Sequence, residues 1–173
     1  EKDVLEASET LHKKLLHDGI RSHIDDRETT PGNKYYDWEL KGVPLRVEIG
    51  PKDVEKNELT MVRRTITKKR SVPLKDAEKA IQDELQALDQ TLYANAEKLL
   101  NENMHYVLTA KEAKEKTGIV ALPWCGNKDC ALEIENVLEG NTLGEPIENA
   151  VCTDPCPVCG ASAKTWMRFA KSY

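Results

Sequence analysis

Two closely spaced pairs of cysteines constrain this chain more than any other feature of its sequence. The first pair is Cys125 and Cys130, and the second is Cys156 and Cys159. A glycine follows one cysteine of each pair and eases the tight backbone that lets both sulfurs face one point. Two such pairs predict a four-thiolate tetrahedral site. Zinc is the default ion for it, because thiolates in a closed tetrahedron suit a redox-silent cation.

The fifth cysteine, Cys152, makes the number of cysteines odd and lies four residues before Cys156. In a cytosolic chain, this arrangement favours a metal over disulfides. Cys152 could replace Cys156 as the third ligand, but we expect it to be a bystander. A catalytic zinc usually carries histidine or carboxylate ligands, and no histidine follows His105, so we interpret the site as structural. The alternatives are reduced cysteines packed in a core and a redox dithiol at Cys156 and Cys159.

Composition narrows the class of protein. The chain has 173 residues, 32% charged and 39% apolar, with a formal net charge of −5. Apolar positions occur along the whole length, so the chain can bury the core of one or two small domains. The apolar runs are only a few residues long, whereas a bilayer helix needs roughly 20, so we expect no membrane association. No signal peptide is visible, and because the chain begins without a methionine and inside a predicted helix, we expect a piece of a longer protein.

Hydrophobic periodicity predicts a first part built from helices and a sheet. The clearest strand is 45–49, where Leu45, Val47 and Ile49 alternate with charged residues. In chain order, the predicted elements are a helix at 3–17, a strand at 20–24, a short helix at 33–41, strands at 45–49, 58–65 and 67–72, and a long helix that begins at Pro73 and extends to about Leu99. This order implies an α/β fold in which helices cover a mixed sheet.

A change in composition after Asn103 indicates a second domain. An apolar stretch at 106–108, a charged short helix at 111–116 and an apolar stretch at 118–124 lead into the first cysteine pair. We therefore predict two domains, residues 1–103 and residues 104–173.

The polar segment that begins near residue 26 carries a specific resemblance to a known family. The residues that carry it are Asp26-Arg27, Pro31-Gly32, Lys34, Trp38-Glu39-Leu40-Lys41-Gly42-Val43-Pro44, Arg46 and Ile49-Gly50-Pro51. This run resembles the anticodon-binding domain of class II aminoacyl-tRNA synthetases, specifically the prolyl-tRNA synthetases of the archaeal and eukaryotic type.

The second part of the chain agrees with this resemblance. It resembles the zinc-binding domain that this type carries at its carboxyl end. The residues that carry this resemblance are Pro123-Trp124-Cys125-Gly126, Cys130, the second cysteine pair and Phe169-Ala170-Lys171-Ser172-Tyr173. The resemblance implies a small α+β zinc-binding domain after the anticodon-binding domain. It also implies that one strand of the anticodon-binding domain and the whole catalytic domain precede Glu1, so this chain alone could not activate proline.

The resemblance implies a site that recognises guanine in a single strand, because proline anticodons end in two guanines. The N1–H and N2–H donors of guanine suit a carboxylate, its O6 suits a basic side chain, and its ring stacks on an aromatic or guanidinium plane. We expect the centre of this site to consist of Arg27, Lys34, Tyr36 and Glu39, with Asp26 and Arg46 as weaker candidates. Alternatively, Arg46 only pairs with Glu48, while Trp38 and Tyr35 are expected to pack in the core.

A basic run follows in the predicted hairpin. Its residues Arg63, Arg64, Lys68, Lys69 and Arg70 can neutralise phosphates of the anticodon stem, which adds affinity without sequence recognition. The alternative is an exposed hairpin whose charges prevent edge pairing.

For the parent enzyme, the resemblance implies ligation of proline to its tRNA with ATP and Mg²⁺, which bind in the absent catalytic domain. It also implies a homodimer, a cytoplasmic location and a contact with the catalytic domain through the carboxylate of Tyr173. A frayed terminus is the alternative for Tyr173.

Three other functions stay open at this point. A stand-alone zinc-binding adaptor for proteins would keep the metal without affinity for tRNA. A thiol oxidoreductase would need an accessible cysteine of low pKa, which zinc would abolish. An anticodon-binding domain for threonine, glycine or histidine would leave the cysteine domain unexplained.

Overall fold

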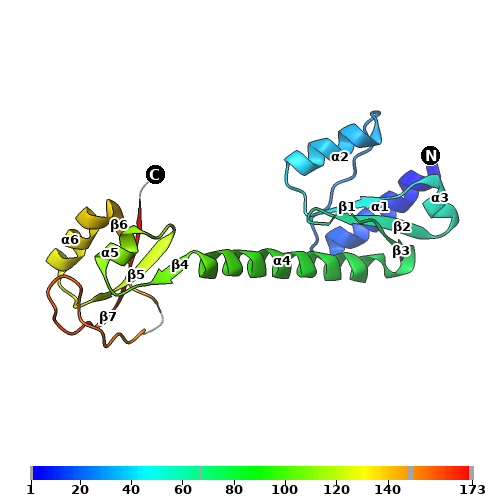
Figure 1. Ribbon diagram of the computed structural model, residues 1–173. Helices are drawn as coiled ribbons and strands as arrows, with labels where there is room; N and C mark the ends of the chain where they lie inside the picture. Colours follow the sequence, from blue (N-terminus) through cyan, green and yellow to red (C-terminus); the bar gives the residue numbers. More distant parts are fainter. Residues whose placement is uncertain (1, 67, 148–149, 172–173) are drawn as a thin grey trace. The chain divides into compact units, whose positions relative to one another are not determined.

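The computed structural model describes residues 2–66, 68–147 and 150–171, which divide into two compact units (Figure 1). The first unit extends to Ala94 and the second begins at Asn95. This division lies inside the long helix α4 (Ala77–Glu102), whereas the sequence placed a boundary just after that helix. Helix α4 extends beyond the packed core of the first unit. Its helical periodicity does not change where that packing ends, so the sequence pattern does not mark the boundary.

The first unit combines helices with an antiparallel sheet. Its strands have the order β1-β2-β3, and both neighbouring pairs are antiparallel. In chain order the elements are α1 (Lys2–His17), α2 (Pro31–Leu40), β1 (Leu45–Glu48), α3 (Pro51–Glu55), β2 (Glu58–Arg63), β3 (Arg70–Pro73), a 3₁₀ turn (Leu74–Asp76) and the start of α4.

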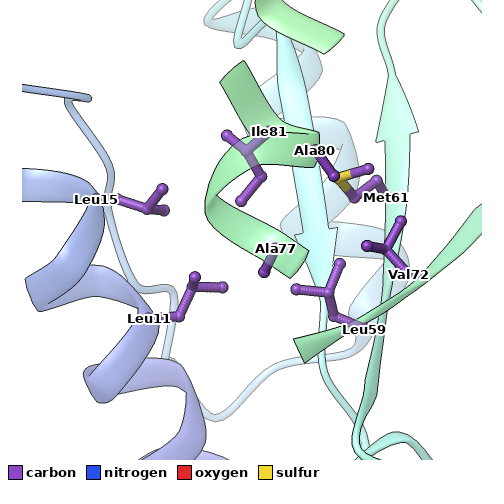
Figure 2. Close-up of a cluster of buried hydrophobic side chains, with 8 residues drawn as sticks. All are labelled: Leu11, Leu15, Leu59, Met61, Val72, Ala77, Ala80 and Ile81. Carbon is purple, nitrogen blue, oxygen red and sulfur yellow. The ribbon is translucent and has the colours of Figure 1, made fainter. Parts of the chain in front are cut away.

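The core of this unit lies on one face of the sheet (Figure 2). Its buried side chains come from α1, β2, β3 and the first turns of α4, and they are Leu11, Leu15, Leu59, Met61, Val72, Ala77, Ala80 and Ile81. Because side chains alternate along a strand, Thr60 and Val62 of β2 face the opposite side from Leu59 and Met61. Helix α2 lies on that opposite side; in Figure 1 it is above the sheet and the start of α4 is below.

Two sequence predictions for this unit were wrong. The predicted strand at 20–24 is extended chain without a ladder partner among the described residues. Its alternation reflects Ile20, which packs against the core, and Ser22, whose hydroxyl lies 2.7 Å from His12 Nδ1. The short helix α3 was missed because Gly50-Pro51 indicated only the end of a strand. Proline also suits the first turn of a helix, and the Asp53 carboxylate accepts the Gly50 N–H at 2.8 Å.

The second unit is built around a mixed four-stranded sheet. Its elements are β4 (Met104–Tyr106), α5 (Ala110–Lys114), β5 (Ile119–Trp124), α6 (Lys128–Leu138), β6 (Gly140–Gly144) and β7 (Thr165–Lys171). The order is β4-β5-β7-β6, with β4 and β5 parallel and the other pairs antiparallel. The expected α/β fold with a mixed sheet is therefore confirmed for the chain. The parallel pair lies in this unit, however, whereas the sequence placed the mixed sheet in the first part, whose described strands are all antiparallel.

Helices α5 and α6 cover one face of this sheet. Ala113, Ile134 and Leu138 pack there against buried residues of β5 and β7, among them Phe169, which is fully buried. The sequence did not predict α6 or β6. Helix α6 begins between Cys125 and Cys130, where the cysteine spacing indicated only a metal-binding turn. In the described ranges no helix is long and apolar enough to cross a membrane.

Candidate nucleic-acid interface and candidate metal centre

A network of charged side chains fixes the loop before α2. The Asp25 carboxylate accepts hydrogen bonds from Arg27 Nε at 2.9 Å and Arg27 Nη2 at 2.7 Å. Arg27 Nη1 donates to the carboxylate of Asp37 on α2 at 2.8 Å. The hydrogen bonds that Arg27 donates to Asp25 are the largest cause that holds the pKa of the Asp25 carboxylate far below its usual value.

The same aspartate binds two further residues of α2. Its carboxylate accepts the indole N–H of Trp38 at 2.7 Å, and its backbone carbonyl accepts Lys34 Nζ at 2.8 Å. The Trp38 ring also has Lys41 Nζ 4.1 Å from its centre. Asp25 therefore binds the edge of the Trp38 ring, and Lys41 covers one of its faces. The sequence predicted core packing for Trp38 and did not predict these polar partners.

A cleft of about 140 Å³ lies between α2 and the strands β1 and β2. Its lining includes an aromatic side chain, Tyr35, a carboxylate, Glu39, and a guanidinium, Arg46. Trp38, Val43 and residues at the end of β2 complete the lining. The cleft thus brings an aromatic ring, a carboxylate and a guanidinium together in one small space.

Arg46 is held in this cleft on several sides. Its guanidinium carbon lies 3.8 Å from the centre of the Tyr35 ring, and Nη1 donates to Glu39 at 3.1 Å. Nε donates to Glu48 at 3.0 Å, so the pairing with Glu48 that the sequence suggested is present beside two other contacts. Burial raises the pKa of Glu48, but hydrogen bonds from Lys69 and Arg46 outweigh it and keep that pKa below its usual value.

Four of the six residues expected to read the anticodon lie in two neighbouring groups. Arg27 and Lys34 belong to the loop network, and Glu39 and Arg46 belong to the cleft. Trp38 connects the groups, because it binds Asp25 and also lines the cleft. Asp26 and Tyr36 are exposed, Tyr36 at 64%, and the structure records no polar contact for either in the described part of the chain.

The basic run does not form one continuous patch. Arg63 has only 13% of its side chain exposed and pairs with Glu84 of α4 at 3.7 Å, and Arg70 donates to the same carboxylate group at 2.7 Å. Lys69 donates to Glu48 at 2.7 Å, while Lys68 is exposed. Arg64 lines the cleft and donates to the carbonyl of Gly42 at 2.7 Å.

Sequence reasoning missed two residues of this interface. Asp25 was passed over, although an aspartate two residues before an arginine is a pattern that forms local ion pairs. Arg64 was grouped with phosphate contacts, but its position at the end of β2 places it in the cleft. Both roles depend on contacts across a turn, which periodicity does not report.

The second unit brings four cysteines together. The Sγ atoms of Cys125, Cys130, Cys156 and Cys159 all lie within 4.8 Å of one another, and those of Cys125 and Cys159 are 3.6 Å apart. Zinc–sulfur bonds of about 2.3 Å in a tetrahedron require sulfurs about 3.8 Å apart, so this cluster fits a metal ion. Gly126 and Gly160 have positive φ angles of 89° and 72°, which allow the tight turns.

Helix α6 and the β5 end position the first pair. Cys125 follows β5, and Cys130 lies in the first turn of α6, whose cap residue Asn127 accepts the Asp129 N–H at 2.9 Å. Asn127 also accepts the Trp124 indole N–H on its carbonyl at 2.9 Å. The turn is therefore fixed by hydrogen bonds of its own.

The thiols of Cys130 and Cys156 differ in how easily they ionise. Burial raises the pKa of Cys130 to about 12. Burial also opposes ionisation of Cys156, but backbone N–H groups of Cys159 and Val158 favour the thiolate and lower its pKa to about 7. Without a cation, one cluster cannot hold four thiolates, whereas a divalent metal stabilises them together.

Cys152 lies outside this cluster. It is 4% exposed, and its Sγ lies 3.9 Å from Asp154 Oδ2.

Strand β7 pairs with both β5 and β6 and anchors the chain as far as Lys171. The predicted role of Tyr173 falls outside the described residues.

Comparisons with known proteins match both units. A family model described as an anticodon binding domain matches residues 1–84. A second model, described as the carboxyl-terminal part of prolyl-tRNA synthetase, matches residues 107–173. The chain belongs to the prolyl-tRNA synthetase family. The resemblance found in the sequence is thereby confirmed.

Relatives and solved structures agree with this family. The chain is 40% identical to a proline–tRNA ligase of Thermococcus kodakarensis and 38% identical to that of Aeropyrum pernix. These alignments cover 100% and 96% of this chain but 38% and 35% of the relatives. A crystal structure of prolyl-tRNA synthetase from Cryptosporidium parvum, complexed with halofuginone and AMPPNP, matches with a TM-score of 0.91 and 30% identity over 100% of this chain and 37% of its own.

Proposed function

We propose that this chain recognises the anticodon loop of proline tRNA through the cleft between α2 and the sheet. The observation that carries the proposal is the placement of Tyr35, Glu39 and Arg46 in one cleft of a unit whose sequence matches an anticodon binding domain. That cleft supplies a stacking surface, a hydrogen-bond acceptor and a cation within one small space.

Each group has a defined task in this proposal. Glu39 is paired with Arg46 through one oxygen, and a carboxylate has further lone pairs that accept N1–H and N2–H of guanine. Arg27 is connected to the cleft-lining Trp38 through Asp25, and in this proposal it binds the O6 side of a guanine. Lys68 and Lys69 contribute positive charge toward the phosphates, which adds affinity for any RNA.

For the whole protein we propose the activity printed for its relatives, ligation of proline to tRNA. ATP and Mg²⁺ would be used by a catalytic domain outside this chain, in a cytoplasmic homodimer. The match of both units to one synthetase family supports this proposal over a stand-alone zinc-binding adaptor, because an adaptor would not need the anticodon unit.

We also propose that Cys125, Cys130, Cys156 and Cys159 hold one structural zinc ion. The fit of the four sulfurs to a tetrahedron and the absence of other donor types among them support this assignment. The ion would neutralise the thiolates and connect the end of β5, the start of α6 and the segment before β7.

Binding of isolated anticodon stem-loops tests the proposal for RNA. The wild-type chain should bind a proline stem-loop about tenfold more tightly than one whose two guanines are replaced. Glu39→Ala should reduce this ratio, while Glu97→Ala on the exposed part of α4 removes the same charge and should preserve it. Equal affinity of the wild-type chain for both RNAs would contradict the proposal.

A further inference from the structure

Asp25 occupies the junction between the loop network and the cleft. Its carboxylate accepts two hydrogen bonds from the Arg27 side chain, one from the Arg27 backbone N–H and one from Trp38, and its carbonyl accepts one from Lys34. The partners come from the loop and from two turns of α2. One residue therefore fixes the positions of three side chains that border the candidate interface.

The hydrogen bonds of Arg27 leave part of its guanidinium available. Arginine has five N–H groups, and Arg27 directs two to Asp25 and one to Asp37. The structure records no further acceptor for it in the described ranges, so one N–H on each terminal nitrogen stays free for a ligand. Two N–H groups are what an arginine uses to bind O6 and N7 of guanine.

The exposure of this pair indicates which member meets the ligand. The side chain of Arg27 is 48% exposed, whereas that of Asp25 is only 13% exposed. The carboxylate therefore lies behind the guanidinium, where it neutralises and orients it without facing RNA phosphates. Rigid support of this kind is what makes a charged contact selective.

Asp25 also determines one wall of the cleft. The Trp38 ring lines the cleft, and its N–H is bound to the same carboxylate that holds Arg27. A shift of the carboxylate would change both the arginine and the tryptophan.

We propose that Asp25 is a positioning residue for guanine recognition, which orients Arg27 and Trp38 without touching the RNA itself. This inference rests on the proposed function, since it requires that the chain recognises guanine. The sequence assigned no role to this residue, and the neighbouring Asp26 does not share its contacts.

The test compares discrimination between two RNAs, because a merely structural role would not change that ratio. Asp25→Asn should bind the guanine-containing proline stem-loop about tenfold more weakly and the guanine-substituted stem-loop with nearly unchanged affinity. Glu28→Gln is the matched control, since it removes the same charge from an exposed position of the same loop. It should preserve discrimination. Equal weakening of both RNAs by Asp25→Asn would overturn the inference.

A double-mutant cycle tests the connection to Arg27. In an Arg27→Ala background, Asp25→Asn should cause a smaller further loss than in the wild type, because Arg27 is gone and only Trp38 is left for Asp25 to orient. Additive losses would overturn the inference. If Asp25→Asn does not fold, Asp25→Glu keeps the charge but moves the carboxylate by one methylene. It should fold and discriminate less than the wild type, so full discrimination by this variant would also count against the inference.

Failure of the proposed function gives a different result. A wild-type chain that binds both stem-loops equally would overturn the proposed function and this inference together. A wild-type chain that discriminates, beside an Asp25→Asn variant that discriminates equally well, would overturn only the role of Asp25.

Discussion

Single residues of the basic run have different environments, although they are neighbours in sequence. Arg63 extends to Glu84 and is largely buried, while Lys68 is exposed. Successive side chains of a strand point to opposite faces, so a run of like residues does not form a continuous patch unless a turn brings them together. Phosphate contact and fold stability are therefore separable functions within this run.

Replacement of these two residues should give opposite results. Lys68→Ala should weaken binding of all RNAs alike and lower the salt dependence of binding by about one charge, without loss of stability. Arg63→Ala should destabilise the first unit by about 1–2 kcal/mol, because it removes a mostly buried side chain that pairs with Glu84. Urea unfolding and salt-dependent RNA binding measure the two effects. A stable Arg63→Ala variant with a reduced salt slope would show that Arg63 contacts phosphate instead.

The pH dependence of stability should reveal the Asp25 network. Its pKa is lowered in the folded state, mainly by Arg27 and also by Trp38. The resulting stability is fully present above the unfolded pKa of about 3.9, begins to decrease below that pH, and is lost as the pH falls through the much lower folded pKa. Unfolding of wild type and Asp25→Asn should therefore differ at pH 7 and converge in acid. A constant difference between pH 7 and pH 3 would contradict this expectation.

At the residue scale, the sequence predicted the chemical types of the interface but not their connections. Guanine needs groups such as those of Arg27, Lys34, Glu39 and Arg46, and the structure places the first two in the loop network and the last two in the cleft. The role of Asp25 depends on Trp38, thirteen residues later, through a contact that no local pattern reports.

Secondary-structure elements position the interface through the packing of β2. Leu59 and Met61 point into the core between the sheet and the helices α1 and α4. The alternate residue Val62 lines the cleft on the opposite side. The register of this one strand therefore determines which side chains enter the core and which line the cleft.

Truncation in this strand should separate the two faces. Leu59→Ala should cost about 2–5 kcal/mol of unfolding free energy, because the side chain is fully buried. Thr60→Ala, on the neighbouring position of the other face, should cost far less. Chemical unfolding measures both variants. A similar loss in both would mean that burial does not distinguish the faces.

At the element scale, periodicity predicted most helices and strands of the first unit. It failed where hydrogen-bonded pairing with another segment determines whether a strand forms. The segment 20–24 alternates like a strand but finds no ladder partner in the described ranges. Helix α6 was concealed by the cysteine spacing, although Asn127 followed by Asp129 is a helix-start signal.

The whole molecule contains two units whose stability should respond differently to metal. If Cys125, Cys130, Cys156 and Cys159 hold zinc, a strong chelator should unfold the second unit and leave the core around Leu59 intact. Proteolysis or hydrogen exchange of the two units measures this. A single transition that chelation does not change would contradict a structural metal.

Metal content of cysteine variants tests the ligand set. Cys156→Ser should lose the ion, whereas Cys152→Ser, a buried cysteine outside the cluster, should retain it. The reverse result would mean that Cys152 is a ligand and Cys156 is not.

The central claim is that guanine of a proline anticodon enters the cleft between α2 and the sheet. A structure of this chain bound to the anticodon stem-loop of proline tRNA tests it most directly. The account predicts a guanine base in the cleft, with its N1–H and N2–H about 3 Å from the Glu39 carboxylate. Bound RNA whose guanines lie outside the cleft, with Glu39 contacting only Arg46, would contradict it.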